Sequence, residues 1–412
     1  MATPAALTKR IEFVVELARR LHEYGTAAPR LEAAINLVAE RLRLTCDVLS
    51  TPTSIVMSFS DLDKEESSLA EITQVVRLSP GEVNLKRLCL VDEIADHVID
   101  GRLGLAEGHR RLREIGQLIP SLRSRLMIVM AYAVASACVA AILLTGWAGV
   151  ATAGVIGLVT GLTALSARKR PNIAAAFEAI SALLATLIAI LIAVYLVPIQ
   201  VRSVVIASLI VLLPGMALTT AVRELSSQHL ISGTARMAGA MAALLKLAFG
   251  AVAATQLCAL FGLIPPHAPA PSVPEWSEWV AVPLAAIAFA ITFRSPLRHY
   301  PVVIGAVLLG YLCTRVGGVY VSAAFGVFLG GLVLGASSNV FARVFSRPGA
   351  LIREPGIILL VPGSVGFRSL SFVFERDVLL GIDTGITLVT LLVALVGGLL
   401  FGDLLVPPRR RL

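Results

Sequence analysis

The sequence predicts a predominantly α-helical membrane protein, in which about ten transmembrane helices form two inverted five-helix repeats behind a small cytoplasmic α+β domain. The 412-residue chain is 57% hydrophobic, with a mean hydropathy of +0.84 and 15% charged residues, whereas a soluble domain carries about 25%. Residues 1–120 hold 15 Lys and Arg against 18 Asp and Glu, and the remaining chain holds 20 against 9. A Pro-Gly pair also recurs after 148 residues, at Pro214-Gly215 and Pro362-Gly363.

The composition argues against several kinds of partner. The excess of basic residues lies in short loops between apolar stretches and forms no basic face with interleaved aromatics, so we predict no nucleic-acid partner. The five cysteines form no CxxC pattern and have no histidine at metal-ligand spacing, so we expect no metal, disulfide framework or cofactor. The N-terminus, MATPAALTKRIEFVVEL, lacks the apolar core of a signal peptide, which predicts a cytoplasmic first domain.

Hydrophobic periodicity predicts a small α+β domain over residues 1–120. A helix over residues 9–24 ends at Gly25, and a second helix follows Pro29. The sequence SIVMSFS alternates as a half-buried strand, and EITQVVRLS can pair with it through a turn at Asp61–Ser68. SPGE, at Ser79–Glu82, predicts a helix N-terminus with a capping box. Another helix is expected over residues 106–119.

This domain also contains residue types that a hydrolase uses. They are Ser54, His22, His97, His109 and Asp61. No nucleophile elbow or phosphate-binding loop surrounds them, so we favour a structural or regulatory domain and predict that the protein is not an enzyme.

Ten apolar stretches are candidates for membrane crossing, since about 20 apolar residues span a bilayer. Five fall in a predicted first half, residues 121–264, and five in a second half, residues 265–412. The first five cover residues 126–146, 148–166, 172–197, 203–222 and 235–263. The second five cover residues 279–293, 301–315, 319–342, 351–366 and 381–406.

The charges of the loops predict the direction of the spans. With the N-terminus inside, the inner loops carry 15 Lys and Arg residues and the outer loops carry four, which is the positive-inside pattern. Trp147, Trp276 and Trp279 fall at the outer interface, as belt residues do. We therefore predict a multi-pass protein of the cell (plasma) membrane, embedded in the lipid bilayer, with both termini cytoplasmic.

The Pro-Gly pairs predict a repeat and a binding site. A shift of 148 residues carries five spans approximately onto the other five, and an odd number of spans makes the second copy inverted. In such transporters, Pro/Gly-interrupted spans at matching positions point to a substrate site near the midplane. We therefore expect Pro214, Gly215, Pro362 and Gly363 to form it, because a broken helix leaves free backbone groups that cannot face lipid. The alternative is that both prolines only kink their helices.

Hydroxyl side chains near the breaks are further candidates for substrate contact. Thr219, Thr220 and Ser364 lie within two turns of a Pro-Gly pair. The alternative is that each hydroxyl donates to the preceding turn of its own helix, which is common.

Ionisable residues within the spans are candidates for proton coupling, because charges inside a membrane are costly. Glu178 and Lys246 lie in the third and fifth spans and can form a pair that carries a proton or stabilises the fold. Asp383 follows the second break and can act there or cap a helix. We expect Arg353, Glu354 and Asp403, at span ends, to be solvated.

Three stretches resemble the threonine/serine exporter family. They are LARRLHEYGTAAPRLEAAINLVAERLRLTCDVLSTPTSIVMS (residues 17–58), LVDEIADHVIDGRLGLAEGHRRLREI (residues 90–115), and the first Pro-Gly span with its tail HLISGTAR (residues 229–236). The resemblance covers essentially the full length, with the cytoplasmic domain and two five-span halves fused in one chain. It implies secondary active export of small hydroxylated amino acids driven by protons, and it carries over no residue roles.

We therefore expect a threonine/serine exporter that works by proton antiport and alternating access, with a small amino acid and protons as partners. A dicarboxylate (succinate-like) exporter is an alternative, because some split members of the family resemble such exporters. A membrane-anchored hydrolase and a channel are alternatives of other classes, and homo-oligomerisation is left open.

Overall fold

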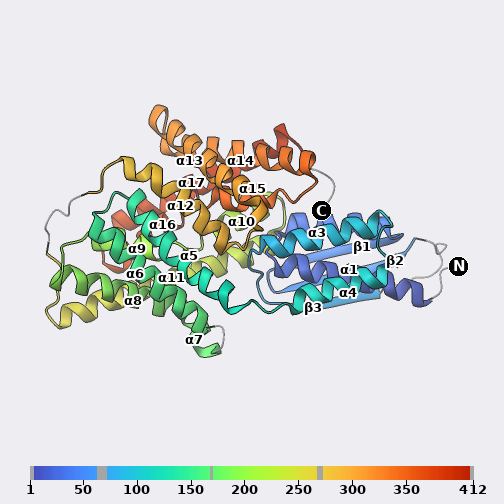
Figure 1. Ribbon diagram of the computed structural model, residues 1–412, viewed down its shortest axis with the longest axis horizontal. Helices are drawn as coiled ribbons and strands as arrows, with labels where there is room; N and C mark the ends of the chain where they lie inside the picture. Colours follow the sequence, from blue (N-terminus) through green and yellow to red (C-terminus); the bar gives the residue numbers. More distant parts are fainter. Residues whose placement is uncertain (1–3, 63–71, 168–169, 267–271, 409–412) are drawn as a thin grey trace.

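The computed structural model describes residues 4–62, 72–167, 170–266 and 272–408, and its elements gather into two parts (Figure 1). The first part, which we call the N-terminal unit, comprises α1–α4 and a three-stranded sheet. The second, which we call the helical part, comprises every later helix. A mostly helical chain behind a small α+β region is therefore confirmed, whereas domain boundaries at residues 120 and 264 remain predictions.

The N-terminal unit places helices around one antiparallel sheet, with strand order β1-β2-β3. Apolar residues of α1 repeat at helical spacing and are buried, and Gly25, with φ of +84°, follows the end of this helix as predicted. The elements are α1 (Pro4–Glu23), α2 (Ala28–Arg41), β1 (Leu44–Thr51), β2 (Ser54–Asp61), β3 (Ile72–Arg77), α3 (Leu85–Ile99) and α4 (Leu105–Gln117).

The predicted strands β2 and β3 are confirmed, and β1 is an addition that the sequence analysis missed. Ile55, Met57 and Phe59 of β2 are at most 1% exposed, as a strand with one buried face requires. The alternating positions of β1 include Cys46 and Ser50, whose weak hydrophobicity hides the period of two. The predicted turn at Asp61–Ser68 lies mostly outside the described residues.

The predicted capping box at Ser79–Glu82 is wrong. This segment is irregular, and α3 begins later, with Asn84 as N-cap accepting a hydrogen bond from the Arg87 amide at 3.2 Å. A Cβ atom on Gly81 would lie 1.9 Å from the His22 carbonyl oxygen. The chain is therefore held against the end of α1 before the helix begins, and only glycine fits this approach.

Within the described residues, the helical part contains seven helical segments long and apolar enough to cross a membrane. Six are α5 (Leu122–Ile142), α6 (Trp147–Ala167), α8 (Phe177–Tyr195), α11 (Leu230–Leu260), α14 (Ala323–Phe345) and α17 (Val378–Leu405). The seventh joins η1 (Leu297–His299) to α13 (Tyr300–Tyr320). A shorter apolar helix, α12 (Trp276–Thr292), and the five-residue α7 (Pro171–Ala175) complete the uninterrupted helices.

The two predicted spans that carry the Pro-Gly pairs are each divided into two short helices. The first consists of α9 (Val201–Ser208) and α10 (Gly215–Ser226). The second consists of α15 (Ala350–Ile357) and α16 (Gly363–Phe374). The predicted stretches 203–222 and 351–366 are shorter than the observed interrupted spans. The reason is that the second helix of each span, α10 or α16, continues into polar residues.

Glycines allow the long helices of the second half to approach closely. A Cβ atom on Gly398 of α17 would lie 2.1 Å from the Phe328 carbonyl oxygen of α14, and one on Gly402 would lie 2.6 Å from the Leu332 carbonyl oxygen. Without a strong hydrophobic force between helices inside a bilayer, this contact between small residues is a main source of association.

The N-terminal unit docks on one end of the helical part (Figure 1). Backbone amides of Leu85 and Lys86 donate to the carbonyl oxygens of Phe293 and Arg294, each at 3.0 Å. This pairing fixes the start of α3 against the end of α12. Figure 1 shows α10 and α15 toward the N-terminal unit and α9 and α16 away from it. We call these two sides the near side and the far side of the helical part.

Candidate functional site

The two Pro-Gly pairs create matching interruptions, which we call the breaks (residues 209–214 and 358–362). Pro214 is the N-cap of α10, with φ −78° and ψ 37°, and Pro362 is the N-cap of α16, with φ −82° and ψ 38°. Proline suits these positions because it has no amide hydrogen to leave without an intrahelical acceptor. The two halves of the chain therefore restart a helix in the same way.

The breaks lie in contact with each other. A Cβ atom on Gly363 would lie 3.1 Å from both the Cα and the amide nitrogen of Gly215. One on Gly215 would lie 3.2 Å from the amide nitrogen of Gly363 and 2.1 Å from a methyl carbon of Val361. Glycine is therefore needed on both sides, and the amino-terminal ends of α10 and α16, which carry partial positive charge, meet inside the helical part.

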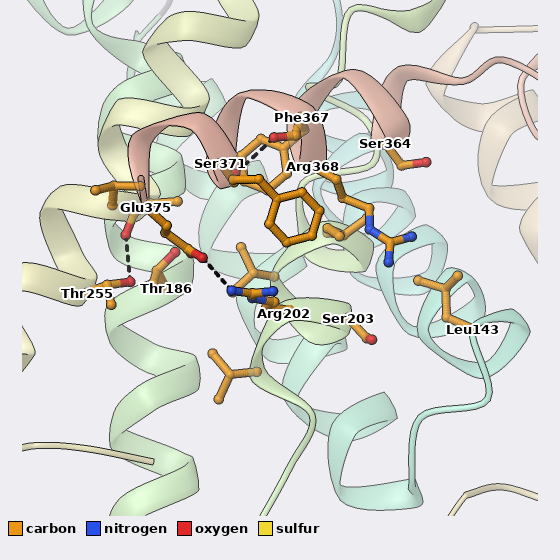
Figure 2. A pocket seen from close by; sticks show the side chains of 16 residues that line it. Leu143, Thr186, Arg202, Ser203, Thr255, Ser364, Phe367, Arg368, Ser371 and Glu375 are labelled. Atoms are coloured by element: carbon orange, nitrogen blue, oxygen red, sulfur yellow. Dashed lines mark hydrogen bonds and ion pairs between the residues drawn. The ribbon is translucent and has the colours of Figure 1, made fainter. Parts of the chain in front are cut away.

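A cavity of about 160 Å³ lies on the far side, between α8, α9, α11 and α16 (Figure 2), and its lining residues do not include Pro214, Gly215, Pro362 or Gly363. Ser364, in the first turn of α16, lines the cavity, which is the position that its predicted contact with substrate requires. We call it the far cavity. Its other lining residues are Leu143, Thr186, Val201, Arg202, Ser203, Val205, Ile206, Ala251, Val252, Thr255, Phe367, Arg368, Ser371, Phe372 and Glu375.

Besides Ser364, the far cavity offers the polar side chains of Thr186 and Arg368 to a ligand. Thr186 is 4% exposed, and its hydroxyl has no hydrogen-bond partner among the described residues. Arg368 has no ion-pair partner within the part of the chain that the structure describes, and its guanidinium points away from α16 toward Ser203 (Figure 2). By contrast, the hydroxyls of Thr255 and Ser371 donate to their own helices, at 3.1 and 2.9 Å.

An ion pair joins α9 to α16 at the edge of the far cavity (Figure 2). Arg202 pairs with Glu375, and its guanidinium also lies 5.0 Å from the centre of the Phe372 ring. Both charged side chains remain substantially exposed, so this contact is cheap to break.

A buried ionic cluster occupies the near side, which we call the near-side network. Asp403 of α17 accepts hydrogen bonds from Arg353 of α15 at 2.6 Å, Arg223 of α10 at 2.9 Å and Asn339 of α14 at 2.7 Å. Arg353 is 2% exposed, and its Nε and Nη1 atoms have no hydrogen-bond partner within the described parts of the chain. The expectation that these span-end charges are solvated is therefore wrong for Arg353 and Asp403.

The burial follows from docking of the N-terminal unit. Glu224 of α10 is fully buried and accepts from the Arg236 guanidinium at 3.0 Å, the Ser232 hydroxyl at 2.9 Å and the Ala28 amide at 3.1 Å. Burial, followed by the charge of Arg353, lowers the pKa of Arg30 in α2 to about 10. The start of α2 therefore covers the near end of the first broken span and removes water from it.

The remaining predicted substrate residues differ in their placement. Thr219 is buried and donates to the Gly215 carbonyl oxygen at 3.1 Å, which is the alternative role of bonding to the preceding turn. Thr220 is half-buried on α10 and is not among the residues that line the far cavity. Of the three hydroxyl residues, Ser364 alone lines this cavity.

Glu178 and Lys246 form the expected pair. The Lys246 ammonium donates to the Glu178 carboxylate at 2.8 Å and approaches the Ala175 carbonyl oxygen at 3.4 Å. The pair joins α8 to α11. Their side chains are 25% and 41% exposed, so the pair lies partly open at the surface of the helical part.

Asp383 is exposed on α17, in the second turn of the helix. The N-cap of α17 is Asp377, whose carboxylate accepts from the Leu380 amide at 3.3 Å, so Asp383 does not cap this helix. A role for Asp383 in proton coupling remains a prediction.

The hydrolase-type residues of the N-terminal unit do not converge. Ser54 and Asp61 lie at opposite ends of β2, where Asp61 pairs with Arg10 at 3.0 Å. His22 is buried, and its Nε2 lies 3.0 Å from the Thr51 carbonyl oxygen. Among the described residues, no group of three His, Cys, Asp or Glu side chains could hold a metal ion.

Sequence reasoning missed Thr186, Arg368 and the near-side network. Arg223 and Glu224 directly follow a predicted span, and Arg353 lies inside another, so an unusual density of charge at the interrupted spans was the available signal. Thr186 gave none, because one hydroxyl in an apolar helix is ordinary.

Comparison with known proteins finds relatives along most of the chain. A pheromone-regulated membrane protein 10 from Eremothecium gossypii is 26% identical over 89% of this chain and 50% of its own length. Proteins of the same name from Zygosaccharomyces rouxii and Yarrowia lipolytica are 26% and 25% identical, over 89% and 88% of this chain and 37% and 30% of their own. This chain thus spans half or less of these relatives. No solved structure matches it significantly.

Two family models match, one in each half. The model described as "Putative threonine/serine exporter" matches residues 12–258, and the model described as "Threonine/Serine exporter, ThrE" matches residues 278–405. Together they include both breaks, the far cavity and the near-side network. The chain therefore belongs to the threonine/serine exporter family, in a form that carries both matched regions in one polypeptide.

Proposed function

We propose that this protein is a secondary active transporter that exports threonine and serine by alternating access. The observation that carries the proposal is the contact between the two breaks, which adjoin a far cavity and a closed near side. A substrate held at the breaks would reach one side or the other when the two halves rock.

The transport unit in this proposal has ten spans. The seven long helical segments, α12 and the two interrupted spans supply five to each half, so the halves insert in opposite directions. The helix starts support this repeat, since 148 residues separate Gly215 from Gly363 and Leu230 from Val378. With the termini in the cytoplasm of a plasma-membrane protein, the far cavity faces outward.

A small hydroxylated amino acid suits the far cavity. Its carboxylate would bind Arg368, since guanidinium recognises carboxylates in a two-pronged geometry, and helix amino-termini add positive potential. The hydroxyls of Thr186 and Ser364 would bind its polar groups. A water-sized group needs about 10–15 Å³ of cavity volume. A cavity of 160 Å³ can therefore hold a molecule the size of threonine.

The charge of the cavity favours a zwitterion over a dicarboxylate. Two guanidiniums line it, but Arg202 is already paired with Glu375, so Arg368 remains as the free cation among the described lining residues. A dicarboxylate would have to draw Arg202 away from Glu375 to pair its second charge, whereas a zwitterion has a single carboxylate, which Arg368 can bind.

Proton antiport is the proposed source of energy. Glu178 and Lys246 are the first candidates, because a charge pair between two spans can gain or lose a proton as the spans separate. Asp383 is the third. Neutral substitutions such as Glu178→Gln should retain exchange of substrate and lose uphill transport.

The direct test is uptake of labelled threonine, serine and succinate into inverted vesicles, with and without a proton gradient. We expect gradient-dependent uptake of threonine and serine. Arg368→Gln should raise KM by about 10- to 100-fold, the value of a hydrogen bond to a charged group. Uptake of succinate alone would favour dicarboxylate export, and flux independent of the gradient would indicate a channel.

A further inference from the structure

We propose that the protein binds an anionic phospholipid between the start of α5 and the end of α12, in the membrane leaflet nearer the N-terminal unit. This inference does not depend on the transported substrate. It rests on two adjoining hollows, one basic and one apolar.

The basic hollow lies where the N-terminal unit meets the helical part, and it has a volume of about 270 Å³. Lys86, Arg87 and Arg294 line it, and its described lining includes no acidic residue. Arg87 is held in place by a hydrogen bond to the Leu118 carbonyl oxygen and by the Tyr24 ring, 5.6 Å away. The other lining residues are Asn84, Leu90, Leu118, Ile119, Pro120, Ser121 and Ser124.

Glu82, which pairs with Arg294, is not among the residues that line this hollow. The Glu82 carboxylate lies 3.8 Å from the Arg294 guanidinium, and its side chain is 79% exposed. Such a contact is weak in water. Lys86 and Arg87 therefore supply positive charge for a phosphate, and basic pockets at this depth of a membrane protein bind anionic head groups.

The apolar hollow is a groove of about 660 Å³ between α5 and α12. On α5, Leu122 is 68% exposed and Met130 is 56% exposed. Arg123, at one end, is the only charged lining residue. The other lining residues are Leu126, Met127, Ala131, Val134, Leu284, Ile287, Ala288 and Ile291.

The length of the groove matches one acyl chain. From Leu122 to Val134, at 1.5 Å per residue, α5 rises about 18 Å, whereas one leaflet of hydrocarbon is about 15 Å thick. A chain lying along this face would therefore reach from the interface to the middle of the bilayer.

The two hollows adjoin at both helices. In α5, Ser121 and Ser124 face the basic hollow while Leu122 and Arg123 face the groove. In α12 the groove ends at Ile291, and Arg294 of the basic hollow follows after one turn. The segment between α4 and α5 also exposes 82% of Ile119. A head group in the basic hollow thus has its acyl chain directed into the groove.

The test is native mass spectrometry of the full-length protein, released from nanodiscs with equal parts of phosphatidylglycerol and phosphatidylcholine. We expect wild-type protein to retain phosphatidylglycerol. The variant Lys86→Gln/Arg123→Gln should retain it about 30-fold less, since each charge is worth about 1 kcal/mol near an anionic surface. Lys9→Gln, an exposed charge on α1, should behave as wild type.

A second variant tests the groove without changing charge. Met127→Trp places a larger apolar side chain in it and should also reduce retention of phosphatidylglycerol, while the protein elutes as wild type in size-exclusion chromatography. If inorganic phosphate by itself displaced phosphatidylglycerol, the lipid assignment would be overturned, because the acyl chain would then add nothing to binding. The assignment would also be overturned if wild type retained both lipids equally, or if the double variant retained phosphatidylglycerol fully. A dimer that buries the groove between two copies and retains no lipid would overturn it as well.

Discussion

The far and near sides of the breaks use corresponding positions for opposite purposes. On the far side, Val205, Thr255 and Ser371 line a cavity. A shift of 148 residues relates Val205 to Arg353, Thr255 to Asp403, and Ser371 to Arg223. The second residue of each pair is an ionic member of the near-side network. The same arrangement of helices is therefore open on the far side, where small or apolar residues occupy these positions, and closed on the near side, where charged residues occupy them.

This difference indicates how the closed side can open again. A buried ion pair recovers little net free energy, because removing two charges from water costs about as much as their attraction returns. An apolar seal of the same size would hold more strongly. A network of three charges and an amide can therefore close the near side firmly enough to exclude water and still separate when the halves move.

The largest effect that would sharpen the comparison is expected from Asp403→Asn. This change removes the carboxylate that accepts from both Arg353 and Arg223 and leaves Glu354 as their nearby acidic group, so we expect the free energy of unfolding to fall by up to about 3–5 kcal/mol. Thermal unfolding in detergent measures the loss. Arg202→Gln, which breaks the exposed far-side pair, is the matched control and should cost less than about 1 kcal/mol. Equal losses would show that the two sides are energetically alike.

The contact between the breaks provides the second test. Gly363→Ala places a Cβ atom 3.1 Å from backbone atoms of Gly215, so the breaks must separate, at a cost typical of overpacking, about 1–3 kcal/mol. We expect threonine uptake to fall by up to about 100-fold, the equivalent of that energy. Gly239→Ala, in α11 with nothing within 4 Å of the added carbon, is the control. Unchanged uptake by Gly363→Ala would mean that transport does not need this close approach.

The breaks could be predicted from the sequence, whereas the far cavity and the near-side network beside them could not. Proline and glycine act on their own backbone, so Pro214 and Pro362 announce an interruption wherever the chain folds, and hydropathy sets the spans around it. Glu178 and Lys246 were recognisable because each lies within an apolar run.

The near-side network depends on distant parts of the chain. Arg353 and Asp403 stand near predicted span ends, where water is normally present, whereas in the fold they pack against α10, α14 and the docked N-terminal unit. The same reasoning explains the capping box at Ser79–Glu82, whose local signal was overridden by contact of Gly81 with His22. Local patterns thus predicted elements and interruptions, whereas burial of charge required the tertiary fold.

A smaller effect is expected from Thr186→Val on the far side. The Thr186 hydroxyl has no hydrogen-bond partner in the part of the chain that the structure describes, so its loss should leave thermal unfolding unchanged. If it binds the substrate, KM for threonine should rise by up to about tenfold, the value of one neutral hydrogen bond. Thr255→Val removes a hydroxyl already bonded to its own helix and should change KM less. Equal KM values for both variants would remove Thr186 from the substrate site.

The smallest effect concerns docking of the N-terminal unit on the near side. The hydrogen bond from Arg347, at 2.9 Å, lowers the pKa of Glu93 in α3. Because the folded pKa is depressed, this pair stabilises docking above the ordinary glutamate pKa of about 4.3, and the contribution disappears as pH falls through the lower, folded value. Glu93 is 41% exposed, so solvent screening limits the contribution to less than about 1 kcal/mol.

The measurement for this pair is hydrogen exchange at the start of α3 as a function of pH, in wild type and Glu93→Gln. Wild type should be better protected at neutral pH, and the two should converge in acid, since protonated glutamate and glutamine are both uncharged. Glu107→Gln, which alters contacts within α4 only, should leave α3 unchanged at every pH. A wild-type advantage that persists in acid would mean that the charge of Glu93 does not hold the N-terminal unit in place, and that closure of the near side relies on the contacts of Glu224 and Arg30 instead.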